Sequence, residues 1–99
     1  MKYEIITTGY FDQWLSKLKD RKAVNAINKR ILRAEAGNLG DIKPVDSGVS
    51  EMRIFVGKGY RVYFSIRNGK LILLLNGGHK DTQASDIKYA KSINEMVEV

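Results

Sequence analysis

The sequence predicts an α+β fold with the element order β-α-α-β-β-β-α. Two turn signals carry most of this prediction. Asn68-Gly69 supplies the two positive-φ residues of a type I′ hairpin turn, and Gly57-Lys58-Gly59 separates two alternating runs and can form another tight turn. The third observation is the helical spacing of apolar residues in the N-terminal third of the chain. Together they predict two helices packed on a mainly antiparallel sheet.

The N-terminal third of the chain predicts one strand and two helices. Residues 2–7 alternate in the manner of a short strand. Apolar side chains then recur at helical spacing over residues 11–18 and 24–34. Thr8 or Asp12 can cap the first helix. Each helix therefore has one apolar face, and both are expected to pack on the same side of the sheet.

The C-terminal half predicts a meander of three antiparallel strands near residues 51–56, 60–67 and 70–76. Residues 71–75 are apolar on both faces, which is expected of a central strand that is covered above and below. The glycines at 77 and 78 are expected in a loop after this strand. A weaker amphipathic pattern over residues 84–97 predicts a terminal helix.

Length and composition predict one domain over residues 1–99 with a modest core. The connection over residues 37–50 holds the only proline, Pro44, and can form a short strand near residues 41–45. Because the chain has no cysteine, neither a disulfide framework nor a thiolate zinc site can form. There is no signal-peptide pattern and no apolar run near the roughly 20 residues of a membrane span, so a cytoplasmic protein without membrane contact is expected.

The net charge of +6 is concentrated in one segment. Residues 16–33 contain seven cations and one acid, Asp20, an excess that equals the net charge of the whole chain. We call these cations the basic ridge: Lys17, Lys19, Arg21, Lys22, Lys29, Arg30 and Arg33. Such a ridge suits a polyanion such as nucleic acid, because phosphate neutralisation releases counterions. A solvated helix face is the alternative.

A second group of cationic residues lies on the hairpins, which can bring its members together: Arg53, Lys58, Arg61, Arg67, His79 and Lys80. Arg53 and Arg61 are expected on the polar face of neighbouring strands, so that both can grip one phosphate. The single histidine and the scattered carboxylates lack the spacing of a metal site. Neither a GxSxG nor a phosphate-loop motif occurs, and no metal or cofactor is expected.

Two stretches carry a resemblance to a known family: the hairpin MRIFVGKGYRVYF and the tail LLLNGGHKDTQASDI. With the element order, they resemble the RelE/ParE toxin superfamily of type II toxin–antitoxin systems, and more narrowly its HigB-like, phage-derived addiction module killer protein branch. The resemblance covers nearly the whole chain and implies a curved, mainly antiparallel sheet. RelE- and HigB-like members cut messenger RNA in the ribosome without a metal, whereas ParE-like members poison DNA gyrase.

The resemblance implies an active site on the polar face of the meander. Arg53 and Arg61 occupy the positions where RNA-cleaving members place their cations, and arginine suits the charge that develops on phosphate oxygens. The alternative for each is an ordinary salt-bridged or solvated strand arginine. Lys80 is expected to hold a phosphate. His79 is expected to act as acid or base, although the family commonly has an acidic residue at this position.

Further residues are assigned to RNA contact: the whole basic ridge together with Lys58, Tyr63 and Arg67. Tyr63 is expected either to stack on a base or to pack half-buried in the sheet. Glu51 is a candidate base, with a solvated or paired carboxylate at the strand entrance as the alternative. Tyr89 is a candidate because a tyrosine near the end of some RelE-like toxins is functional.

These features predict the toxin of a type II toxin–antitoxin system, a metal-independent, ribosome-dependent messenger-RNA endonuclease that inhibits translation. The expected partners are messenger RNA, the ribosome and a cognate antitoxin, which is predicted to be a small helix-turn-helix protein from an adjacent gene. Two alternatives stay open: a ParE-like inhibitor of DNA gyrase and a nucleic-acid-binding regulator without cleavage activity.

Overall fold

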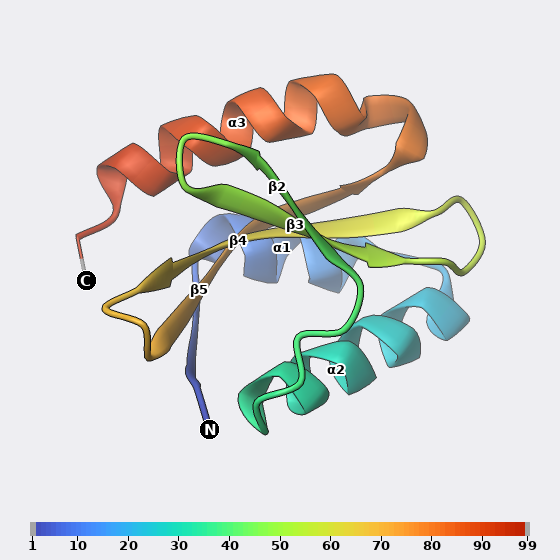
Figure 1. Cartoon of the computed structure of the whole chain (residues 1–99). Coiled ribbons are helices and arrows are strands. Elements are labelled where there is room, and N and C mark those ends of the chain that lie inside the picture. Colours follow the sequence, from blue (N-terminus) through green and yellow to red (C-terminus); the bar gives the residue numbers. More distant parts are fainter. Residues whose placement is uncertain (1, 99) are drawn as a thin grey trace.

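Five strands form one sheet in the computed structural model, which describes residues 2–98 (Figure 1). The elements follow in the order β1 (Glu4–Thr7), α1 (Gly9–Lys17), α2 (Arg21–Glu35), β2 (Ile42–Asp46), β3 (Val49–Ile54), β4 (Tyr60–Arg67), β5 (Leu71–His79), a short 3₁₀ helix η1 (Lys80–Thr82) and α3 (Gln83–Met96). The predicted order is confirmed. β2 occupies the connection in which the sequence allowed a short strand.

The sheet has the strand order β1-β5-β4-β3-β2. β2 to β5 form a consecutive antiparallel meander, and β1 pairs in parallel with β5. β5 therefore lies between two strands, which confirms the central position predicted from its apolar residues on both faces. The turn between β4 and β5 has Asn68 at φ 55° and Gly69 at φ 67°, as the type I′ prediction requires.

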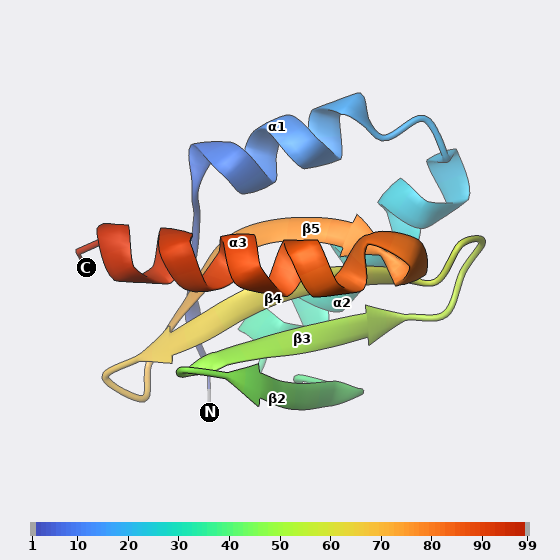
Figure 2. The same cartoon turned by 90° about the horizontal axis from the view of Figure 1, so that it is seen from above.

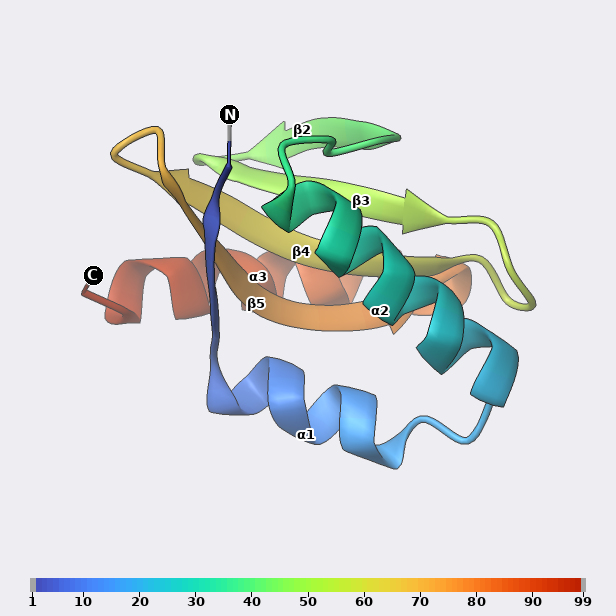
Figure 3. The same cartoon turned by 90° about the horizontal axis from the view of Figure 1, so that it is seen from below.

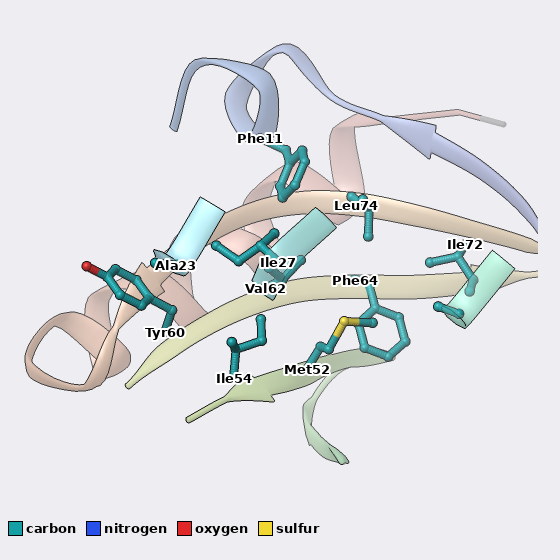
Figure 4. Close-up of a cluster of buried hydrophobic side chains, with 11 residues drawn as sticks. Phe11, Ala23, Ile27, Met52, Ile54, Tyr60, Val62, Phe64, Ile72 and Leu74 are labelled. Carbon is teal, nitrogen blue, oxygen red and sulfur yellow. The ribbon is translucent and has the colours of Figure 1, made fainter. Parts of the chain in front are cut away.

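Helices cover both faces of the sheet (Figure 3). α1 and α2 share one face, where Phe11 and Ile27 lie in one buried cluster with Val62 and Leu74 of the sheet (Figure 4). This confirms the prediction for the two N-terminal helices. α3 packs on the opposite face over a second buried cluster. Thr8 caps α1, because its hydroxyl accepts a hydrogen bond from the Phe11 amide at 3.1 Å.

β5 is longer than the sequence predicts, because it continues through Gly77 and Gly78 to His79. A Cβ atom at Gly77 would overlap the indole of Trp14 from α1, and one at Gly78 would overlap the carboxylate of Asp86 from α3. The two glycines therefore let a helix approach the strand closely on each face. The expectation of a loop here is wrong, because glycine marks close packing at these positions instead of the end of the strand.

Candidate functional site

A small cavity opens at one end of the meander, beside the turn between β3 and β4. Its volume is about 170 Å³, and its lining includes Arg53 of β3, Arg61 of β4 and Lys80 of η1, together with Phe55 and Gly59. Figure 2 shows this turn projecting beyond the start of α3. Three predicted catalytic cations thus meet in one place, although they come from three different elements.

Arg53 and Arg61 are direct neighbours across β3 and β4, on the face that α3 covers. Each of the two guanidinium groups has an acidic partner. Arg53 Nη2 donates to Asp41 Oδ1 at 2.7 Å, and this hydrogen bond and the charge of Asp41 raise the pKa of Arg53. Arg61 Nε lies 3.7 Å from Glu51 Oε2, a charge contact that is longer than a hydrogen bond. Both arginines therefore lie side by side, each with a carboxylate beside it.

Glu51 holds Arg61 from beneath α3. The Glu51 side chain is only 2% exposed, against 13% for Arg61, and its two carboxylate oxygens accept hydrogen bonds from Gln83 Nε2 at 3.2 and 2.9 Å. Arg61 Nη1 also donates to the Gly59 carbonyl at 2.8 Å. The expectation of a base at the strand entrance is corrected, because β3 already begins at Val49 and the start of α3 covers Glu51. The paired-carboxylate alternative is the one that the structure shows.

Tyr63 is fully buried beneath α3. Base stacking and half-buried packing, the two alternatives expected for this residue, are therefore both wrong, because the side chain is completely buried. Its hydroxyl group has no hydrogen-bond partner among residues 2–98. Burial, followed by the charges of Glu51 and Asp86, raises the pKa of Tyr63. The neutral phenol belongs to the core and cannot contact RNA in this structure.

The free energy of unfolding of Tyr63→Phe should equal that of the wild type or exceed it by up to about 2 kcal/mol, because the change removes a buried hydroxyl group without a partner. The variant should also lose less stability in alkali. Because the pKa of Tyr63 is raised in the folded protein, its phenol stays protonated at a pH where the same phenol in the unfolded chain ionises. The wild type therefore keeps its full stability below the unfolded pKa of about 10 and loses stability as the pH rises from there toward the folded pKa. Urea unfolding at neutral and alkaline pH measures both effects, and a less stable variant at neutral pH would contradict the unpaired hydroxyl.

Arg67 binds the C-terminal end of α3. Its Nη2 atom donates to the main-chain and side-chain oxygens of Asn94 at 3.0 and 2.7 Å, and its Nη1 atom donates to the Val97 carbonyl at 3.1 Å. These bonds satisfy carbonyl groups that a helix C-terminus leaves without intrahelical partners. The RNA contact predicted for Arg67 is therefore corrected to a structural role.

Arg30 of the basic ridge also has a structural role instead of the predicted RNA contact. Its Nη2 atom donates to the carbonyls of Leu39 and Asp41 at 3.1 Å each, and its Nη1 atom donates to the Arg53 carbonyl. Burial, followed by the charge of Arg33, lowers the pKa of Arg30. Arg30 thus ties α2 to the end of β3 and supports the strand segment that carries Arg53.

The other members of the basic ridge are exposed: Lys17, Lys19, Arg21, Lys22, Lys29 and Arg33. They belong to α1, α2 and the loop between these helices, which cover the face opposite α3. An open groove of about 630 Å³ lies between the two helices and combines the apolar Leu15, Leu18 and Val24 with Lys19 and Arg21. The ridge therefore lies on the helices of one face, whereas Arg53 and Arg61 project toward the other. The two regions approach each other near Asp20, whose carboxylate accepts a hydrogen bond at 3.4 Å from the hydroxyl group of Tyr60, a residue of the cavity lining.

Three other predicted residues stay outside the cavity lining. His79 pairs with Tyr60 across β5 and β4, which turns it to the face opposite Arg61, and its Nδ1 atom accepts a hydrogen bond at the start of η1. Lys58 is exposed in the turn between β3 and β4. Tyr89 packs edge-on against a tyrosine of α1, with ring centroids 5.5 Å apart. Of the four predicted catalytic residues, His79 is thus the one that the cavity excludes.

Phe55 is the cavity residue that sequence reasoning missed. It follows β3 directly, it is 74% exposed, and the guanidinium carbon of Arg53 lies 5.6 Å from the centroid of its ring. Alternation along the strand gives the signal that identifies it. Because Ile54 is buried on the α2 face, residue 55 must turn to the side of Arg53, where an aromatic ring stands among polar positions.

Among residues 2–98, no three histidine, aspartate or glutamate side chains lie close enough together to bind a metal ion. No helix within this range is both long and apolar enough to cross a membrane.

The chain is similar in sequence to a bacterial protein and in fold to solved toxin structures. An uncharacterised protein of Haemophilus influenzae is 55% identical over 91 residues, which span 92% of each chain. No protein-family model matches the chain. A mutant of Escherichia coli toxin RelE in the free state is similar with a TM-score of 0.71 and 13% identity, over 98% of this chain and 100% of that one. The RelBE2 toxin–antitoxin complex from Mycobacterium tuberculosis is similar with a TM-score of 0.65 and 20% identity, over 81% of this chain and 100% of that one.

Proposed function

The chain belongs to one protein family with its Haemophilus influenzae relative and has the fold of the RelE toxins, and from these premises we propose that it is the toxin of a type II toxin–antitoxin system. The resemblance to the RelE/ParE superfamily is confirmed at the level of the fold. Membership of the HigB-like branch stays a prediction. The proposed activity is metal-independent cleavage of messenger RNA on the ribosome, which stops translation.

One observation carries this proposal: Arg53, Arg61 and Lys80 line the same small cavity. In RNA cleavage without a metal, the 2′-hydroxyl gives up its proton and its oxygen bonds to the neighbouring phosphorus. The bond from this phosphorus to the 5′-oxygen breaks, the 5′-oxygen takes up a proton, and negative charge builds up on the phosphate oxygens during the step. Cations that are already in place beside those oxygens stabilise this charge. Arginine suits the task because its planar fork donates to two oxygens at once and stays charged.

Each residue in or beside the cavity has its own role in this proposal. Arg61 grips the phosphate at which the chain is cut, because the Gly59 carbonyl and the Glu51 carboxylate already fix the direction of its fork. Arg53 and Lys80 complete the positive field around the phosphate. Glu51 acts through Arg61 and is a positioning residue, since its carboxylate is buried beneath α3.

Purified protein is expected to cut messenger RNA that is bound to translating ribosomes and to cut the same RNA poorly when it is free. Primer extension on both RNA samples measures the difference. Equal cleavage of both samples would remove the ribosome from the proposal. The absence of cleavage in both, together with inhibition of purified DNA gyrase, would favour the ParE-like alternative.

We propose further that a cognate antitoxin, a small helix-turn-helix protein encoded beside this chain, binds and suppresses it. One structural neighbour comes from a toxin–antitoxin complex. The groove between α1 and α2 combines apolar side chains with Lys19 and Arg21 of the basic ridge, which fits an acidic amphipathic segment. Co-expression with the adjacent reading frame should restore growth and yield a co-purified complex. Failure of both would count against this partner.

A further inference from the structure

The Phe55 ring has an unusual position for a large apolar side chain. It is 74% exposed, and it stands beside Arg53, Arg61 and Lys80 at the rim of the cationic cavity. Single exposed apolar residues are common on protein surfaces and need no function. The chemistry around this ring, a cavity with three cations, is what separates it from the other exposed apolar side chains.

The backbone explains why the ring has nothing to pack against. Ile54 points into the cluster beneath α2, so Phe55 must point to the opposite face of the sheet. On that face α3 begins at Gln83, which covers Glu51. Phe55 follows β3 directly, where the chain enters the turn between β3 and β4, and this turn projects beyond the start of α3 (Figure 2). The ring is therefore outside the core that α3 closes.

The ring is nevertheless held in place. Arg53 lies over it at 5.6 Å from the ring centroid, a cation–π contact. Arg53 is itself anchored, because its Nη2 atom donates to Asp41 at 2.7 Å. An exposed ring fixed by an anchored cation loses little conformational freedom when a planar ligand stacks on it.

We propose that Phe55 is the stacking platform for one nucleobase of a single-stranded RNA whose adjacent phosphate lies in the cavity between Arg53, Arg61 and Lys80. The inference rests on the proposed function and assigns the base-binding part of the same site. Stacking on an aromatic ring holds an unpaired base with little dependence on sequence, while the cations hold the backbone. A base within a duplex is stacked on its neighbours and cannot use the platform.

The test compares two ligands at one ionic strength: a short single-stranded oligoribonucleotide and an oligonucleotide of the same length and charge without bases. Phe55→Ala and Phe55→Leu should weaken binding of the RNA by about 5- to 150-fold and leave binding of the base-free ligand unchanged, because stacking on an aromatic ring requires a base. Phe55→Tyr should bind as the wild type does. Leu32→Ala is the matched control, since it removes a 65% exposed apolar side chain from α2, and it should change neither affinity.

The inference is overturned by unchanged RNA affinity in Phe55→Ala, by an equal loss for both ligands, or by no binding of the single-stranded RNA by the wild type at low salt. If Phe55→Ala instead lost only its affinity for the antitoxin, the ring would belong to a protein interface, which also overturns the inference. The proposed function fails separately, when the wild type binds RNA through Phe55 but induces no transcript cleavage in cells. Transcript cleavage by a wild type whose RNA affinity does not depend on Phe55 removes the platform alone.

Discussion

Arg61→Ala is expected to slow messenger-RNA cleavage about a hundred- to a thousandfold, which corresponds to roughly 2.7 to 4 kcal/mol of lost transition-state stabilisation. The effect is large because Arg61 is fixed from two sides, by the Gly59 carbonyl at 2.8 Å and by Glu51 at 3.7 Å. Arg61→Lys keeps the charge but lacks the planar fork, so it should recover only part of the rate. Single-turnover cleavage of ribosome-bound RNA gives the rate for the wild type and for both variants.

Lys88→Ala is the matched control for this prediction. It also removes one positive charge, but from an exposed position on α3 that does not line the cavity. It should cleave at close to the wild-type rate. Thermal unfolding checks that each variant is folded. A folded Arg61→Ala protein with wild-type cleavage would show that the active site lies elsewhere.

Arg67→Ala is expected to lower the free energy of unfolding by about 1.5 to 3 kcal/mol. The change removes charge-assisted hydrogen bonds to Asn94 and Val97 and leaves the end of α3 without these partners. The cleavage rate of the folded fraction should not change, because Arg67 does not line the cavity. Urea denaturation gives the stability, and single-turnover cleavage gives the rate.

Lys70→Ala controls for the loss of a cation from the same hairpin, because Lys70 is exposed at its tip. Its stability should stay within about 0.5 kcal/mol of the wild type. If Arg67→Ala were as stable as this control but bound RNA more weakly, the RNA contact predicted from the sequence would be restored and the capping role would be lost.

The fold could be predicted where local signals are strong. Asn68-Gly69 determines a hairpin through backbone geometry alone, and an apolar strand such as residues 71–75 must be covered on both faces. The extension of β5 through Gly77 and Gly78 could not be predicted in this way. Its cause is the close approach of Trp14 on one face and Asp86 on the other, and these contacts exist only after the helices have packed.

The cavity could be predicted in part for a similar reason. The turn and the alternation of β3 and β4 are enough to bring Arg53 and Arg61 together. Tyr63 and Arg67 share the same face of β4, but α3 covers Tyr63 and its C-terminal end binds Arg67. The sequence does not say how far a terminal helix reaches across a sheet. That reach decides which polar-face residues are buried and which stay at the surface, and it also leaves Phe55 exposed.

A map of transcript 5′ ends after induction of the protein in cells tests most directly whether it is a messenger-RNA endonuclease that acts through Arg61. The cavity mechanism predicts new 5′ ends inside coding regions with the wild type, few or none with Arg61→Ala produced at the same level, and intact chromosomal DNA in both cultures. Intact transcripts in growth-arrested cells, accompanied by double-strand DNA breaks, would contradict the mechanism and assign the protein to the gyrase inhibitors.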